Sequence, residues 1–145
     1  VPVLYGDMAW IPPYVRHKVE MVRLWTRLCN MENNRLTKKV FRWDMDRAKS
    51  GILNWSKEVE AILSFCGLKH VFDNMTGANV LNIVRSRYMD DFVSKWRQLI
   101  AEKSKLRLYR GIKTDFIVEP YLKCCLPRNL RSLIAIMRSG TFPLY

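Results

Sequence analysis

Acidic residues are scarce in this sequence, and their scarcity is its most informative feature. The 145 residues include 13 Asp plus Glu against 25 Lys plus Arg, which gives a formal net charge of +12 at pH 7. An excess of this size predicts a polyanionic partner, either a nucleic acid or an acidic membrane surface. No apolar run approaches the roughly 20 residues that span a bilayer. We therefore expect no membrane partner and favour nucleic acid.

Metal-ligand spacing is also missing. The chain has four Cys and two His, but it contains no CxxC pair, and His17 and His70 are isolated from every thiol. Cys29 and Cys66 fall in apolar helical contexts, which favours reduced, mostly buried thiols. No signal-peptide pattern opens the chain. We expect no metal site, no cofactor, and an intracellular location in the cytoplasm, the nucleus or both.

Apolar residues are plentiful enough for one packed domain. They make up 49% of the sequence, including five Trp, and a chain of this length normally buries roughly 70% of its unfolded surface. We predict an all-α fold in which residues 1–145 form a single compact bundle of five to six helices. An extended lead-in over residues 1–12 is expected before the bundle. Because the chain opens with Val and ends with Tyr, we also expect it to be a fragment of a larger polyprotein.

The stretch from Pro13 to Met31 predicts the central helix of that bundle. At 3.6 residues per turn its apolar side chains cover a very wide arc, with Trp25 in the middle. A helix that is apolar over so much of its circumference must contact partners on several sides. The Pro12-Pro13 pair suits a helix start, where the missing amide hydrogens cost little.

Cap signals predict the next two helices. Asn34 suits the N-cap of a second helix, and Asn54 and Gly67 suit the N-cap and the stop of a third. We expect the apolar stripe of the second helix to be Leu36, Val40 and Trp43. We expect its exposed side to carry Lys38, Lys39 and Arg42.

Residues 88–91 spell YMDD, which resembles the polymerase motif of reverse transcriptases. In that setting the paired aspartates bind two Mg²⁺ ions for phosphoryl transfer. The apolar spacing around the motif instead predicts a helix, on which Asp90 and Asp91 point about 100° apart. Arg87 and Lys95 lie four residues to either side of Asp91, as on a solvated surface. We expect exposed helical carboxylates and no catalytic residues here.

Two basic segments near the C-terminal end are candidate binding elements. Over residues 103–113 Lys and Arg alternate with Leu and Tyr, which suits phosphate contact combined with base or sugar packing. The alternative is a solvated connector that its Leu and Tyr anchor to the core.

The last helix is expected from Pro127 to Ser139, with three arginines on one side. Its expected buried face is Leu130, Leu133, Ile134 and Met137. An ordinary charged outer face is the alternative interpretation of the arginines.

The candidate nucleic-acid-binding residues are Arg107, Tyr109, Arg110, Lys113, Arg128, Arg131 and Arg138. We expect the six basic members to form one continuous face. If each contacts one phosphate, the log–log salt slope of binding would be about −4 for single strands and about −5 for duplex DNA.

Six blocks of sequence carry a family resemblance: YVRHKVEMVRLWTRLCNM, NRLTKKVFRWD, NWSKEVEAIL, KLRLYRGIKTDF, EPYL and RNLRSLIAIMRSGTFPL. In this order and spacing they resemble the region that follows the reverse transcriptase domain in polyproteins of invertebrate non-LTR retrotransposons. In that family the polymerase palm and the endonuclease lie upstream, and a Cys/His zinc-binding segment lies downstream. The resemblance implies an accessory module that helps a reverse transcriptase to hold its RNA template or its target DNA.

The sequence thus favours a non-catalytic nucleic-acid-binding accessory domain of a retrotransposon reverse transcriptase, whose partners are RNA or DNA and the rest of the polyprotein. The alternative is an interaction or scaffolding bundle that docks an acidic protein partner, such as an element fragment captured for a host role. An enzyme in its own right is the third hypothesis, although the family's activity, RNA-directed DNA polymerisation, belongs to its upstream palm. The oligomeric state is left open.

Overall fold

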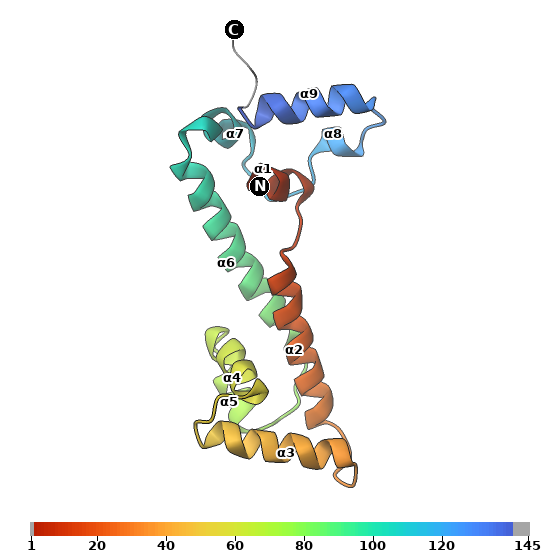
Figure 1. Cartoon of the computed structure of the whole chain (residues 1–145), viewed down its shortest axis with the longest axis vertical. Coiled ribbons are helices and arrows are strands. Elements are labelled where there is room, and N and C mark those ends of the chain that lie inside the picture. The colour runs from red at the N-terminus through yellow and green to blue at the C-terminus, as the bar shows by residue number, and fades with distance from the viewer. Residues whose placement is uncertain (1, 141–145) are drawn as a thin grey trace. The chain divides into compact units, whose positions relative to one another are not determined.

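The computed structural model describes residues 2–140, and every regular element in that range is helical (Figure 1). The all-α prediction is confirmed. Nine α-helices over the described range exceed the five to six expected, because short helices also form in segments that looked like connectors. The helices are α1 Pro2–Met8, α2 Pro13–Cys29, α3 Leu36–Lys49, α4 Trp55–Phe65, α5 Lys69–Asp73, α6 Leu81–Glu102, α7 Arg107–Ile112, α8 Pro120–Lys123 and α9 Arg128–Arg138, with a 3₁₀ turn, η1 Ser104–Leu106, before α7.

The chain divides into two compact units in place of the single bundle that was expected. The contiguous unit is residues 12–89, and the described part of the terminal unit joins residues 2–11 to residues 90–140. Each unit has a hydrophobic core of its own. The prediction that residues 1–145 act as a single domain stays a prediction. No helix of the described range is long and apolar enough to cross a membrane.

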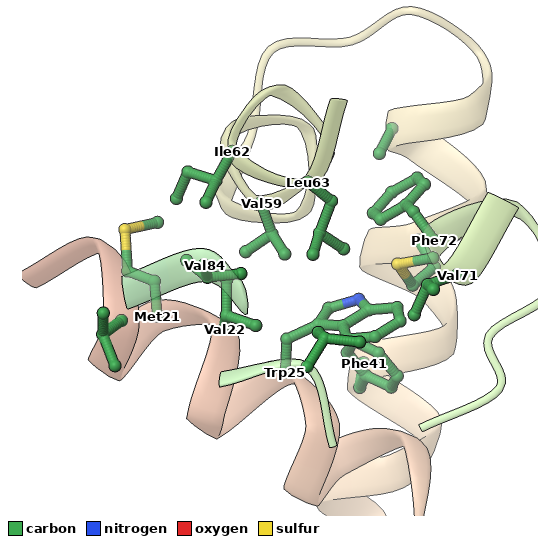
Figure 2. Packing of buried hydrophobic residues seen from close by; sticks show 14 residues of the cluster. Met21, Val22, Trp25, Phe41, Val59, Ile62, Leu63, Val71, Phe72 and Val84 are labelled. Atoms are coloured by element: carbon green, nitrogen blue, oxygen red, sulfur yellow. The ribbon is translucent and has the colours of Figure 1, made fainter. Parts of the chain in front are cut away.

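Trp25 is the centre of the core of the contiguous unit, as the sequence predicts. Its side chain is fully buried, and its ring stacks on Phe72 with the ring centroids 5.8 Å apart. Figure 2 shows the indole of Trp25 beneath Leu63 of α4, with Val59 and Val22 beside it. Pro13 occupies the first turn of α2, where its missing amide hydrogen leaves no bond unmade.

The orientation of α3 differs from the prediction. The helix buries Phe41, and with it Met45 and Ala48 at i+4 and i+7. Leu36, Val40 and Trp43 lie on the opposite side and are 76%, 55% and 59% exposed. The expected stripe was therefore wrong, because this helix carries two apolar stripes and periodicity alone does not choose between them. We call the exposed one the α3 outer stripe.

Lys38 is buried, although the sequence placed it on the exposed side of its helix. Its Nζ atom donates hydrogen bonds to the carbonyl oxygens of Leu28 (2.7 Å) and Cys29 (2.6 Å). These carbonyls belong to the last turn of α2, where no amide of the same helix is available to them. A cation at a helix C-terminus also interacts favourably with the helix dipole. Lys38 therefore caps α2, and Arg35 takes the N-cap position expected for Asn34.

The end signals of α4 are confirmed. The side chain of Asn54 accepts a hydrogen bond from the amide of Lys57 at 2.9 Å, which is the expected N-cap contact. Gly67 follows the helix with a φ of +74°, a conformation that glycine adopts without strain. Asp44 adds a contact that the sequence did not indicate, because its carboxylate accepts hydrogen bonds from both the amide and the hydroxyl of Ser56.

The N-terminal segment is helical over Pro2–Met8 and not extended as expected; residue 1 lies outside the described residues. The helix α1 packs on the core of the terminal unit, where the Trp96 indole donates a hydrogen bond to the carbonyl of Pro2 at 2.8 Å. Tyr5 meets Phe92 edge to face with the ring centroids 5.8 Å apart. Because a seven-residue helix is unstable alone, its conformation depends on these tertiary contacts, which local sequence does not reveal.

The helix α9 has the expected length, but its expected buried face is wrong. Leu130, Leu133 and Met137 are 44%, 44% and 53% exposed, and Ile134 is partly buried. The residue of α9 that is buried is Arg138. The helix is turned so that a paired arginine, and not the leucines, faces the interior of the terminal unit.

Candidate nucleic-acid interface

Two of the candidate residues, Tyr109 and Arg138, meet at a buried carboxylate in the terminal unit. The Asp7 carboxylate accepts hydrogen bonds from the hydroxyls of Tyr109 (3.0 Å) and Tyr121 (2.8 Å) and from a guanidinium nitrogen of Arg138 (3.1 Å). The Asp7 side chain is only 4% exposed. A charge removed from water in this way must be paired or hydrogen-bonded. Helices α1, α7, α8 and α9 are thereby joined at one carboxylate.

A third candidate, Lys113, extends this arrangement. Its Nζ atom forms an ion pair with Glu119 and donates a hydrogen bond to the carbonyl of Ile117, and its side chain is 1% exposed. Glu119 in turn forms an ion pair with Arg138 at 3.2 Å. We call the six side chains the Asp7 cluster: Asp7, Tyr109, Lys113, Glu119, Tyr121 and Arg138. Its two carboxylates balance its two cations.

The ionisation of the Asp7 cluster follows from this geometry. Burial raises the pKa of Tyr109 and of Tyr121 well above the ordinary value, and the negative charge of Asp7 raises both further. Burial by itself would lower the pKa of Arg138, but the hydrogen bond that Arg138 donates to Asp7 and the charges of Asp7 and Glu119 outweigh burial and raise that pKa. Both tyrosines thus remain neutral hydrogen-bond donors to a charged carboxylate.

The predicted continuous face of six basic residues does not form. Lys113 and Arg138 are buried in ion pairs, and Tyr109 is fully buried, so its ring is not available to stack on a base. The physical reason is that the interior of the terminal unit contains two carboxylates that need cationic or hydroxyl partners. Four candidates remain exposed: Arg107, Arg110, Arg128 and Arg131.

The four exposed arginines differ in how they are engaged. Arg110 donates to the carbonyl of Ala101 at 3.1 Å. Arg128 and Arg131 line an open groove of about 600 Å³ between α1, α8 and α9. Within residues 2–140 neither of these two guanidinium groups has a hydrogen-bond or ion-pair partner. Together with this groove they are the strongest candidate site for an anionic ligand.

Sequence reasoning missed Asp7 and Glu119, the carboxylates that engage the basic candidates. Asp7 did carry a signal, because it is the sole charged residue of the otherwise apolar and small-residue stretch VPVLYGDMAWIPP. A lone carboxylate in such a stretch is a candidate for burial with a partner. Nothing in the sequence indicates which cation or hydroxyl that partner is.

The YMDD segment lies inside α6, which confirms the helical prediction. Asp91 pairs with Lys95 one turn later at 2.7 Å, and Asp90 is exposed. Arg87 lies over the ring of Phe65 at 5.5 Å. Within the described residues, no group of three or more His, Cys, Asp or Glu side chains is arranged to hold a metal ion.

The cysteines are free thiols in two different environments. Cys29 and Cys66 are partly buried, and burial raises the pKa of Cys29 to about 11 and raises that of Cys66 as well. Cys124 and Cys125 are exposed, so the expectation of four mostly buried thiols is wrong for this pair.

No protein-family model, no curated protein and no solved structure matches the chain. The resemblance to the polyproteins of non-LTR retrotransposons therefore stays a prediction.

Proposed function

We propose that this chain is a non-catalytic nucleic-acid-binding module that serves a reverse transcriptase of the non-LTR retrotransposon type. In that role it holds RNA template or target DNA beside a polymerase located elsewhere in the polyprotein. The observation that carries the proposal is the pair Arg128 and Arg131 at an open groove of a chain with a net charge of +12. Neither guanidinium group has a hydrogen-bond or ion-pair partner among residues 2–140. The sequence blocks supply the link to retrotransposons.

Phosphate is the anion that this arrangement suits best. A guanidinium donates two parallel hydrogen bonds to a phosphate and stays charged at every physiological pH. An arginine already paired to a carboxylate would have to break that pair before binding, whereas Arg128 and Arg131 need not. Arg107 and Arg110, exposed on α7, add two further positive charges in the same unit.

A salt titration tests the proposal. With four phosphate contacts in place of six, binding should weaken with a log–log salt slope of about −3 for a labelled single-stranded RNA and about −3.6 for a labelled duplex DNA. The double variant Arg128→Gln, Arg131→Gln should flatten the slope by about 1.5 to 2 and weaken all sequences alike. Arg23→Gln is the matched control, because Arg23 is exposed but already paired with Glu20 at 2.7 Å. Failure of the parent chain to bind any nucleic acid at low salt would overturn the proposal.

The α3 outer stripe favours a second candidate function, an interaction bundle that docks an acidic protein partner. Three large apolar side chains are exposed there, and Arg47 lies over the ring of Trp43 at 4.7 Å. An amphipathic helix with acidic flanks would match such a surface. This candidate would be favoured over the first if the parent chain bound an acidic amphipathic peptide but no nucleic acid. The Val40→Glu variant should then lose binding of that peptide.

A further inference from the structure

The groove at α9 has two kinds of wall. Arg128 and Arg131 form its charged edge, and Leu4 and Met8 of α1 with Leu122 of α8 supply apolar surface opposite. Leu4 is 49% exposed, so its side chain is accessible to a ligand. A volume of about 600 Å³ lies within the range of roughly 300–1,000 Å³ that is typical of small-ligand sites. Figure 1 shows α1, α8 and α9 at the same end of the terminal unit.

The wall that α9 contributes is low beside the two arginines. Ser132 and Ala135 line the groove next to them, and Ile136 adds a larger apolar side chain to the same wall. Small side chains let a flat ring lie close to the helix, and the hydroxyl of Ser132 can donate to or accept from a ring edge. The groove thus combines space for a planar ring with cations at its edge.

The electrostatics of the groove favour an anion despite the presence of Asp7 in its lining. The Asp7 carboxylate is already satisfied by three donors, one of them the cation Arg138. Its negative charge is therefore neutralised within the Asp7 cluster. Among residues 2–140 no carboxylate pairs with Arg128 or Arg131, so these two side chains make the groove edge positively charged.

We propose that the α9 groove takes one unstacked base of a single-stranded nucleic acid, while Arg128 and Arg131 hold the phosphate beside it. This inference rests on the proposed function and names its substrate class. A duplex keeps its bases paired and stacked, so it can offer the arginines its phosphates but cannot place a base in the groove. The groove therefore discriminates single strands from duplexes, as base-stacking sites do in other single-strand binders.

Filling the groove tests the inference. Ala135→Leu places a larger side chain on the α9 wall, and it should weaken binding of a labelled oligo(dT) by about five- to tenfold while leaving binding of a duplex of equal length unchanged. Leu133→Phe enlarges a side chain of the same helix at an exposed position outside the groove lining. This control should bind both ligands like the parent chain. Fluorescence anisotropy at fixed low salt measures all four affinities.

A second variant keeps the test decisive if Ala135→Leu disturbs folding. Leu4→Ala shortens an exposed side chain on the opposite wall, and it should weaken single-strand binding selectively by a smaller factor. Equal effects of the groove variants on single strands and duplexes, or no effect on either, would overturn the inference and leave the proposed function standing. The inference would also be overturned if an acidic peptide competed with the single strand for the parent chain and the Ala135→Leu variant no longer bound that peptide. The groove would then be a peptide-binding site. Absence of all nucleic-acid binding would remove the proposed function and the inference together.

Discussion

Two carboxylates, Asp7 and Glu119, determine which basic residues of the terminal unit are engaged in ion pairs and which stay exposed. Glu119 pairs with Lys113, and both Asp7 and Glu119 pair with Arg138. In the sequence these two cations lie among apolar residues, as the exposed arginines do. The sequence pattern around Arg138 is the same as that around Arg131, a basic residue beside apolar ones on a helix. What separates them is a partner 131 residues away in the case of Arg138. Local pattern cannot contain that information.

The burial of Trp25 predicts a large loss of stability on truncation. Trp25→Ala should lower the free energy of unfolding by about 3–5 kcal/mol, because it removes a fully buried aromatic and leaves a cavity in the core. Trp43→Ala is the matched control. Because Trp43 is 59% exposed, this substitution should lower the free energy of unfolding by about 1 kcal/mol or less. Urea denaturation followed by circular dichroism measures both. Equal losses for the two variants would contradict the placement of the core.

The surroundings of Gly6 and Gly111 predict that alanine substitutions at these two positions change stability in different ways. A Cβ atom at Gly6 would collide with the Tyr109 hydroxyl and the Trp96 ring, whereas one at Gly111 would have no heavy atom within 4 Å. Gly6→Ala should therefore destabilise the terminal unit, by about 1–3 kcal/mol as expected for overpacking. Gly111→Ala should be neutral or stabilising by up to about 1 kcal/mol, because alanine favours a helix. Thermal melts of the two proteins give the comparison, and a stabilised Gly6→Ala protein would show that α1 does not pack there.

At the scale of helices, the sequence predicts ends better than faces. Pro13, Asn54 and Gly67 mark helix ends where the sequence indicates them, because caps depend on local backbone chemistry. The faces of α3 and α9 were wrong, since each helix has apolar residues on more than one side and tertiary packing selects among them. The short α1 could not be predicted for the same reason, as its contacts lie in distant segments.

The position of YMDD on α6 predicts that its carboxylates are dispensable. Replacing Asp90 and Asp91 together by Asn should change stability by no more than about 0.5 kcal/mol, the usual value of an exposed i,i+4 pair such as Asp91–Lys95. Nucleic-acid affinity should stay equal or rise slightly, because two negative charges are removed. Isothermal titration calorimetry with Mg²⁺ tests whether the parent chain binds this ion. Binding that disappears in the double variant would revive the polymerase interpretation.

At the scale of the whole molecule, the sequence predicts the all-α character but not the number of compact units, and the class of partner inferred from the charge stays a prediction. The excess of basic residues and the apolar periodicity led to an all-α, basic module. The division into two units depends on which segments far apart in sequence pack together. The candidate binding residues were placed correctly only in part. Four arginines are exposed as expected, whereas Tyr109, Lys113 and Arg138 are buried in the terminal unit.

The Asp7 cluster predicts a loss of stability in alkali. The pKa values of Tyr109 and Tyr121 are raised on folding, so the folded chain holds these protons more tightly than the unfolded chain, in which tyrosine has a pKa of about 10. Their contribution is complete below about pH 10 and is lost as the pH rises above that value. Denaturation at a series of pH values from 8 upward measures the slope. Tyr121→Phe should make the decrease of stability with pH shallower. An unchanged decrease in this variant would show that Tyr121 does not contribute to the loss of stability in alkali.

The discontinuous make-up of the terminal unit has a consequence for synthesis on the ribosome. The helix α1 emerges early, but the partners of Asp7 follow 102, 114 and 131 residues later. At roughly 5–20 residues per second, the contiguous unit has time to fold while α1 still waits for its partners. The two units are therefore completed in a fixed order during translation, and a nascent chain stalled before Arg138 carries one finished unit and an Asp7 that lacks its counter-ion.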